Sequence, residues 1–321
     1  MWIITGGAGF IGSALLWKLN EEGFSDIMVV DREEFPEKKK NLRKRRFADY
    51  LEADDFKEKL LGGKFSKIEG IVHMGACSST TETNEAYLTR NNYEYTKALA
   101  QWALSKKVPF LYASSAATYG DGAFGYSTDD TTTQKLKPLN LYGNSKQQFD
   151  LWALREGVLK NLVGIKFFNI FGPNEYHKGD MRSVVAKAYE QIKKDGKIGL
   201  FKSYNPQYRD GEQRRDFLYV KDAVDVVYQF MNENSYGGLY NLGAGEARSW
   251  NDLAKAEFSA LGIAPRIEYI EMPEMIRAKY QYHTQADMGW MKQKKFAPFR
   301  TLEASVKDYV QNYLSKEDPY L

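Results

Sequence analysis

The sequence has 321 residues, a length at which a chain buries roughly three quarters of the surface that its unfolded form exposes. It carries 45 Lys and Arg against 42 Asp and Glu, and the net charge of +3 is too small for a general nucleic-acid or membrane binder. One cysteine and three widely spaced histidines exclude a disulfide framework and do not predict a metal centre. No apolar run is long enough to span a membrane, and an apolar strand at the first residues leaves no room for a signal peptide, so we expect a soluble, cytoplasmic protein.

Apolar strands alternate with helices through the first half of the chain. A strand over 1–5 leads through a glycine-rich turn into a helix in which apolar side chains recur at helical spacing. Further strands are predicted at 27–30, 70–74, 108–113 and 162–168, and the longer helices at 83–106 and 141–159. Continuous apolar strands between helices are typical of a parallel sheet that is covered on both faces. We therefore predict an α/β fold with a doubly wound, Rossmann-type sheet and a smaller α/β substrate-binding lobe.

The pattern becomes less regular after Phe168 and predicts a lobe built from several returns of the chain. Helices are expected at 183–194, 222–232, 251–261 and 302–313, and strands at 218–220, 239–242 and 266–270. We predict a dinucleotide-binding domain over 1–167 with a return at 218–243. The substrate-binding lobe is expected to combine 168–217 with 244–321.

Three glycines between the first strand and the first helix predict a dinucleotide site. In this context Gly6 permits a tight turn, Gly9 lets the backbone approach a pyrophosphate, and Gly12 allows close packing of the helix on the strand. The alternative is a turn that serves packing alone. Two residues separate successive glycines, and this spacing differs from the common dehydrogenase pattern and points to another branch.

The residues that follow the second strand give conflicting signals about the cofactor. Asp31 can accept a hydrogen bond from a ribose hydroxyl, which favours NAD, whereas Arg32 and Lys38 can pair with a 2′-phosphate, which favours NADP. We expect NADP and keep NAD as the alternative. We interpret segment 37–46 as a basic loop in which most charged side chains are exposed to solvent. It lacks the interleaved aromatic residues that are typical of a nucleic-acid-binding surface.

A tyrosine and a lysine lie four residues apart, on one face of a predicted helix. A phenol with a pKa of about 10 is a poor base, but the ammonium group of Lys146 beside Tyr142 and an oxidised nicotinamide both favour the phenolate. Such a pair can exchange a proton with a sugar hydroxyl. Ser115 ends a strand at the edge where ligands of open α/β sheets bind, so its hydroxyl can bond the reacting oxygen. A tyrosine four residues before a lysine occurs by chance in many helices. Combined with the glycine turn and the strand that ends at Ser115, however, the pair indicates a catalytic site.

Five blocks of sequence occur in the order found in a known family. The blocks are 5–12, 113–120, 142–146, 168–173 and 215–222. With them the chain resembles the extended short-chain dehydrogenase/reductase family over essentially its whole length. Members mostly act on nucleotide-activated sugars, which the resemblance implies as the substrate class. Ala116 and Ala117 replace the acid pair of members that eliminate water, so dehydration is disfavoured.

Further blocks at 73–81, 91–93, 138–142, 172–179 and 278–287 resemble the branch of this family that inverts C6 of an ADP-linked heptose with tightly held NADP. The resemblance implies an isomerase with two bases, Tyr142 and Lys178, and a Lys146 that positions the cofactor and lowers the pKa of Tyr142. Since Lys178 must shed a proton, we expect burial or nearby cationic charge to lower its pKa. The resemblance also implies a homo-oligomer of five or ten subunits and a role in lipopolysaccharide inner-core precursor synthesis.

The remaining contacts are also carried over from the resemblance. Besides the glycines, Asp31, Arg32, Lys38, Lys146 and Lys178, the cofactor contacts are Phe10, Ile11, Met74, Gly75, Ala76, Cys77, Ser78, Asn91 and Ile170. The substrate contacts are Ser115, Asn169, Asp180, Lys187, Phe201, Tyr204, Arg215 and Tyr280. The planar guanidinium of Arg215 suits the paired oxygens of a diphosphate. Three positions depart from the family: Asp180 replaces a serine, Met74 a glutamate, and Ala53 a cofactor-associated lysine, which weakens the case for NADP.

Two alternatives remain open. One is an NAD-dependent epimerase acting at C4 of a UDP-hexose with Tyr142 as its base. The other is a non-catalytic nucleotide sensor, since a fold does not determine a function. The intact set of Tyr142, Lys146 and Ser115 argues against the sensor.

Overall fold

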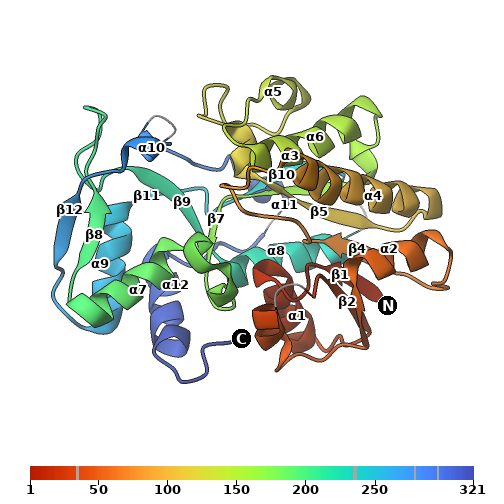
Figure 1. The fold of residues 1–321 in the computed structure, drawn as a ribbon, viewed down its shortest axis with the longest axis horizontal. Helices are drawn as coiled ribbons and strands as arrows, with labels where there is room; N and C mark the ends of the chain where they lie inside the picture. Colours follow the sequence, from red (N-terminus) through yellow and green to blue (C-terminus); the bar gives the residue numbers. More distant parts are fainter. Residues whose placement is uncertain (34–35, 234–236, 278–279, 295) are drawn as a thin grey trace. The chain divides into compact units, whose positions relative to one another are not determined.

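The computed structural model describes residues 1–33, 36–233, 237–277, 280–294 and 296–321 (Figure 1). Ala278 and Lys279, which begin one of the resemblance blocks, lie outside the described residues. The chain forms two compact units, the first from 1–167, 224–241 and Leu321, the second from 168–223 and 242–320. The return into the first unit is shorter than the expected 218–243. Its first predicted residues belong to a strand that pairs within the second unit.

The first unit contains a sheet in the order β10-β6-β5-β4-β1-β2-β3. Its strands are β1 Trp2–Thr5, β2 Ile27–Asp31, β3 Asp49–Glu52, β4 Gly70–His73, β5 Phe110–Ser115, β6 Val163–Phe167 and β10 Gly238–Leu242. Its helices are α1 Phe10–Glu21, α2 Ala53–Leu61, α3 Glu85–Leu88, α4 Tyr95–Lys106, α5 Asp130–Lys135, α6 Leu141–Arg155 and most of α8 Val220–Asn232. The pairs from β3 through β6 are parallel. This confirms the predicted doubly wound, Rossmann-type fold.

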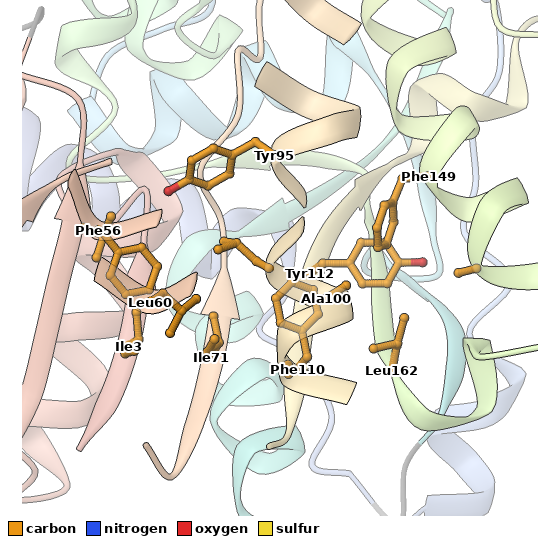
Figure 2. Packing of buried hydrophobic residues seen from close by; sticks show 14 of the residues in the cluster. Ile3, Phe56, Leu60, Ile71, Tyr95, Ala100, Phe110, Tyr112, Phe149 and Leu162 are labelled. Carbon is orange, nitrogen blue, oxygen red and sulfur yellow. The ribbon is translucent and has the colours of Figure 1, made fainter. Parts of the chain in front are cut away.

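Apolar side chains fill the space between this sheet and the helices α2, α4 and α6 (Figure 2). Ile3 and Ile71 project from the sheet toward Phe56 and Leu60 of α2. Farther along the sheet, the rings of Tyr112 and Phe149 meet edge to face with centroids 4.6 Å apart. Helices α1 and α8 lie on the other face and are joined by an ion pair of 2.9 Å between Lys18 and Asp225. Both faces are therefore covered, which explains the continuous apolar character of the strands.

A buried ion pair fixes helix α6 against the sheet. The ammonium group of Lys166 on β6 lies 2.6 Å from a carboxylate oxygen of Asp150 on α6, and both side chains are fully buried. Ser114 and Tyr112 of β5 donate hydrogen bonds of 2.7 and 2.9 Å to the same carboxylate. Lys166 also donates to the Thr118 hydroxyl at 2.8 Å. These contacts fix the position of α6 against the sheet. Because α6 carries Tyr142 and Lys146, they also fix where these two side chains lie.

Replacing Lys166 by methionine is expected to lower the free energy of unfolding by about 3–5 kcal/mol, because Asp150 is left as a buried charge without its partner. Urea unfolding followed by circular dichroism measures the loss. Lys166→Met combined with Asp150→Leu should recover most of it, since an apolar pair removes both charges. A loss below about 1 kcal/mol in the single variant, typical of an exposed ion pair, would contradict a structural role.

The second unit contains a sheet in the order β11-β9-β7 and a parallel pair of strands, β8 and β12. Its strands are β7 Asn169–Phe171, β8 Ile198–Phe201, β9 Arg214–Tyr219, β11 Ala247–Ser249 and β12 Ile267–Ile270. Its helices are α7 Val184–Asp195, α9 Trp250–Leu261, α10 Glu274–Arg277, α11 Gly289–Lys294 and α12 Leu302–Tyr309. Val185, Leu253 and Val306 form the centre of its core, between α7, α9 and α12. Within the described ranges, no helix combines the length and the apolar character needed to cross a bilayer.

Two local differences from the predicted elements bear on function. The helix expected over 83–106 contains a π-helical turn, Thr89–Glu94. The strand expected at 218–220 begins earlier, at Arg214, and Val220 already starts α8. Short helical turns complete the chain: Pro36–Leu42, Ala116–Tyr119, Leu159–Asn161, Tyr176–Met181 and Val310–Leu314.

Candidate active site

The glycine turn forms a backbone cradle at the carboxyl edge of β1. Gly6 has a φ of +64°, and a Cβ added to it would lie 2.6 Å from the backbone nitrogen of Gly75. A Cβ on Gly12 would lie 2.1 Å from the carbonyl oxygen of Gly6. Gly9 precedes the first turn of α1, whose N–H groups and dipole favour a phosphate group. A cradle that a single Cβ would fill, at a helix N-terminus, fits the pyrophosphate of a dinucleotide.

A buried histidine ties the loop after β4 to this cradle. His73 Nδ1 lies 2.6 Å from the Thr5 hydroxyl oxygen, and His73 Nε2 lies 2.8 Å from that of Thr96. Burial lowers the pKa of His73 to about 3, so the ring stays neutral. The Thr5 hydroxyl also accepts the Gly75 N–H at 3.2 Å. Gly6 and Gly75, both predicted to contact the cofactor, are thereby brought together.

The carboxylate of Asp31 at the end of β2 is held by its neighbours. It accepts the Ala8 N–H at 2.9 Å and the Arg32 N–H at 2.8 Å. The ammonium group of Lys38 lies 3.2 Å from the same carboxylate. Arg32 Nε donates to the Asn91 side chain at 3.1 Å. The structure thus places Lys38 and the Arg32 backbone at the Asp31 carboxylate, whereas the Arg32 guanidinium lies 3.2 Å from Asp54.

Tyr142, Lys146 and Ser115 come together at the start of α6 and the end of β5. Burial raises the pKa of Tyr142, although a hydrogen bond with Ser115 lowers it. Burial also lowers the pKa of Lys146 to about 8. The ammonium group of Lys146 donates to the Ala113 carbonyl at 2.8 Å. The net direction for the pKa of Tyr142 is upward because burial is the largest cause, and the lowering expected from Lys146 and an oxidised nicotinamide stays a prediction.

Cys77 lies beside this group, in the loop after β4. Burial raises the pKa of its thiol, so it is not an activated nucleophile. Its backbone N–H donates to the Asn92 side chain at 2.9 Å, and Asn92 donates to the Cys77 carbonyl at 2.9 Å and the Ser145 hydroxyl at 3.0 Å. Asn92 thus joins the loop after β4 to α6 from within the π-helical turn. The sequence prediction names Asn91 as a cofactor contact and includes Asn92 only within the block 91–93, because the sequence does not show that the Asn92 side chain is fully buried.

Lys178 lies in the second unit, in the turn Tyr176–Met181 that follows β7. The side chain is half-buried, and burial lowers its pKa, which the nearby carboxylate of Glu175 opposes. The direction agrees with the expected lowering, and of the two expected causes it is burial that acts here. Lys187 on α7 donates to the Asp180 carbonyl at 2.5 Å, so two of the predicted substrate contacts meet in the same segment.

Arg215 is held between two aromatic rings in the second unit. Its guanidinium carbon lies 5.1 Å from the Tyr280 ring centroid and 5.8 Å from that of Trp250. The indole N–H of Trp250 donates to the Tyr280 hydroxyl at 2.9 Å. Stacking restrains the plane of the guanidinium, as bidentate recognition of phosphate oxygens requires. Trp250 was missed by the sequence prediction, because its distance of 35 positions from Arg215 along the chain hides the contact.

The other predicted substrate residues extend from this stack. The Tyr282 ring meets that of Tyr280 edge to face at 5.1 Å, and its hydroxyl accepts the Tyr204 N–H at 3.2 Å. Phe201 ends β8 and is half-buried. On β7, Asn169 is exposed and Ile170 is half-buried. Among the residues that the structure describes, no group of three or more His, Cys, Asp and Glu could hold a metal ion.

Comparisons with known proteins show the family of the chain. Residues 2–243 match the NAD dependent epimerase/dehydratase family. The chain is 52% identical over the full length of both chains to ADP-L-glycero-D-manno-heptose-6-epimerase of Nitratidesulfovibrio vulgaris, and 47% identical, again over both full lengths, to the enzyme of that name from Fusobacterium nucleatum. The crystal structure of the Helicobacter pylori ADP-L-glycero-D-manno-heptose-6-epimerase is 27% identical, with a TM-score of 0.79 over 97% of this chain and 95% of that chain. A UDP-N-acetylglucosamine 4-epimerase from Methanobrevibacter ruminantium has a TM-score of 0.80 at 20% identity, over 97% and 96% of the two chains, and shows the likeness of the fold alone.

Proposed function

The chain belongs to the NAD dependent epimerase/dehydratase family, and we propose that it is an isomerase that inverts C6 of the heptose in ADP-D-glycero-D-manno-heptose. The product is ADP-L-glycero-D-manno-heptose. The observation that carries the proposal is the 52% identity, over both full lengths, to a protein named for this epimerisation. The gathering of Tyr142, Lys146 and Ser115 beside the glycine cradle supports a reaction that needs both a dinucleotide and a proton acceptor.

The chain's own residues fit a bound dinucleotide. Gly6, Gly9 and Gly12 would hold its pyrophosphate, and Asp31 with Arg32 its adenosine ribose. A bound nicotinamide would supply the hydride acceptor and donor that inversion at C6 requires. Lys146 would position the nicotinamide end, and burial lowers the pKa of its ammonium group to about 8.

Proton transfer at the C6 hydroxyl needs a base in each direction. Hydride return to the opposite face requires the carbonyl at C6 to turn, so its oxygen takes two orientations. We assign one orientation to Tyr142, with Ser115 as hydrogen-bond partner of the reacting oxygen, and the other to Lys178. Each base removes the hydroxyl proton as C6 is oxidised in one direction and gives it back as C6 is reduced in the other. The lowered pKa of Lys178 supports its role, since the neutral amine is the form that accepts a proton.

We assign NADP as the cofactor because Lys38 lies 3.2 Å from the Asp31 carboxylate and Arg32 follows Asp31 directly in the chain. The Arg32 guanidinium lies 3.2 Å from the carboxylate of Asp54, a partner that it would exchange for the 2′-phosphate. Arg32→Ala is expected to weaken NADP binding about tenfold to a hundredfold, the loss of one or two charge-assisted hydrogen bonds, and to leave NAD binding unchanged. Isothermal titration with each nucleotide measures both affinities. Lys39→Ala is the matched control, because Lys39 is exposed and pairs with Glu33. Tighter binding of NAD than NADP by the unaltered protein would contradict the assignment.

The remaining parts of the proposal follow the family resemblance. They are a cytoplasmic location, a homo-oligomer of five or ten subunits and a supply of heptose for lipopolysaccharide inner-core precursors. Sedimentation velocity of the purified protein tests the assembly.

Two measurements on the purified protein test the proposed function. Mass spectrometry of the nucleotide released on denaturation identifies the cofactor. Incubation with ADP-D-glycero-D-manno-heptose, followed by chromatographic separation of the epimers, tests the reaction, with UDP-glucose as the competing substrate. Conversion of the ADP-heptose alone is the expected result, and conversion of UDP-glucose alone would contradict the proposal.

A further inference from the structure

A fully buried carboxylate lies three residues before Lys178. Oε1 of Glu175 accepts hydrogen bonds from the Ser183 hydroxyl at 2.7 Å, the Tyr309 hydroxyl at 3.0 Å and the Gly172 N–H at 3.3 Å. Oε2 accepts the Ser183 N–H at 2.5 Å. The donors come from both ends of the segment that carries Lys178 and from helix α12.

These contacts close segment 172–183 into a loop. Gly172 lies just after β7, and Ser183 is the N-cap residue of α7, where its hydroxyl accepts the Ala186 N–H at 3.2 Å. The Tyr309 hydroxyl attaches the loop to the core of the unit. One carboxylate therefore determines where both ends of the loop lie, and with them the backbone from which Lys178 extends.

A buried charge at this position reduces the stability of the fold, so its presence points to a role other than packing. Burying a carboxylate costs several kcal/mol even after relaxation, and a well-packed apolar group of similar volume often stabilises a protein more. The groups that interact electrostatically with Glu175 are two cations of its own loop, Lys178 and Arg182, and the phenols of Tyr176 and Tyr309. Arg182 also pairs with Glu190 on α7. Of these two cations, Lys178 is the one to which the proposed function assigns proton transfer.

We propose that Glu175 is the positioning residue of Lys178: its carboxylate fixes the loop that presents this lysine and supplies the negative charge that balances the ammonium group between proton transfers. The inference rests on the proposed role of Lys178 as a base. It assigns to Glu175 no contact with substrate or cofactor.

The decisive variant is Glu175→Gln, which keeps the size of the side chain and an acceptor oxygen and removes the charge. The titration of Lys178 is followed by NMR of protein labelled with ¹³C-lysine, with Lys178→Met identifying the signal. We expect the pKa of Lys178 to fall by about one unit or more, because a neighbouring anion no longer stabilises its charged form. Glu268→Gln on β12 is the matched control, since Glu268 is exposed and pairs with Lys197, and it should leave the titration unchanged.

Activity supplies the second measurement. Glu175→Gln is expected to lower kcat for the ADP-heptose at least tenfold with KM within about twofold, and to shift to lower pH the limb of the pH–rate profile that reports the titration of Lys178. Added to Lys178→Met, the same substitution should cost little further activity, because its effect passes through the lysine. Losses that multiply in the double variant would overturn the inference.

If Glu175→Gln does not fold, the Tyr309→Phe variant tests the same inference. It removes one donor to Oε1 and keeps the ring in the core, so kcat should fall a few-fold while the folded state persists in circular dichroism. A Lys178 pKa and a kcat at wild-type values in whichever of these variants folds would overturn the inference. If the titration shifts as expected but the unaltered protein does not convert the ADP-heptose, the proposed function fails and the coupling between Glu175 and Lys178 stands.

Discussion

The Tyr142→Phe variant is expected to lose about 10²- to 10⁴-fold in kcat for epimerisation, the usual contribution of a positioned acid or base. The ring and its packing remain, and only the hydroxyl that exchanges a proton is lost. NADP should still bind, because the glycine cradle and the residues around Asp31 are untouched. Epimer separation over time measures kcat, and Tyr228→Phe on α8 is the control for a phenol of the same unit outside the site.

The pH dependence of the unaltered enzyme adds a directional test of the same residue. Tyr142 accepts a proton as the phenolate, and burial raises its pKa, so activity that depends on this form rises with pH. The hydrogen bond with Ser115 lowers the pKa of the phenol. Ser115→Ala should therefore shift the acid limb of kcat/KM to higher pH. Full activity in Tyr142→Phe, or a shift to lower pH in Ser115→Ala, would contradict the assignment.

The Lys178→Met variant is expected to lose about 10²- to 10⁴-fold in kcat, as much as Tyr142→Phe, and to keep NADP bound. Methionine fills similar space and cannot accept a proton. Lys178→Arg should be equally inactive, since a guanidinium keeps the positive charge and does not deprotonate in proteins. Lys197→Met, an exposed lysine next to β8 that pairs with Glu268, is the control.

Arginine separates the two possible roles of the lysine. If Lys178 acts only through its charge, Lys178→Arg retains most activity while Lys178→Met does not. That outcome would reject the assignment of the second base and leave Tyr142 as the proton acceptor for both orientations. The same rates at a single substrate concentration well above KM suffice to decide between the two.

Local patterns in the sequence are sufficient to predict the main features of the first unit. The period of the apolar residues predicts the parallel sheet, and the need for backbone without a Cβ makes Gly6 and Gly12 recognisable from their spacing between a strand and a helix. Tyr142 and Lys146 share a helix, so their proximity follows from spacing alone.

Contacts between distant parts of the sequence could not be predicted in the same way. Trp250 stacks on Arg215, and Glu175 accepts a hydrogen bond from Tyr309, across separations that no local pattern records. The environment that raises the pKa of Tyr142 is hidden for a related reason. The helical spacing shows that Lys146 is near, but the burial of the phenol and the hydrogen bond from Lys146 to Ala113 emerge only when β5 and α6 pack together.

The fate of the hydrogen on C6 tests the proposed chemistry most directly. ADP-D-glycero-D-manno-heptose carrying deuterium at C6 is incubated with the enzyme in ordinary water, and the L-glycero product is analysed by mass spectrometry and NMR. If the cofactor removes and returns this hydrogen while Tyr142 and Lys178 handle only the hydroxyl proton, the product keeps its deuterium at C6 in the inverted configuration. A product in which solvent hydrogen has replaced the label would mean that C6 is deprotonated, and it would contradict inversion by oxidation and re-reduction.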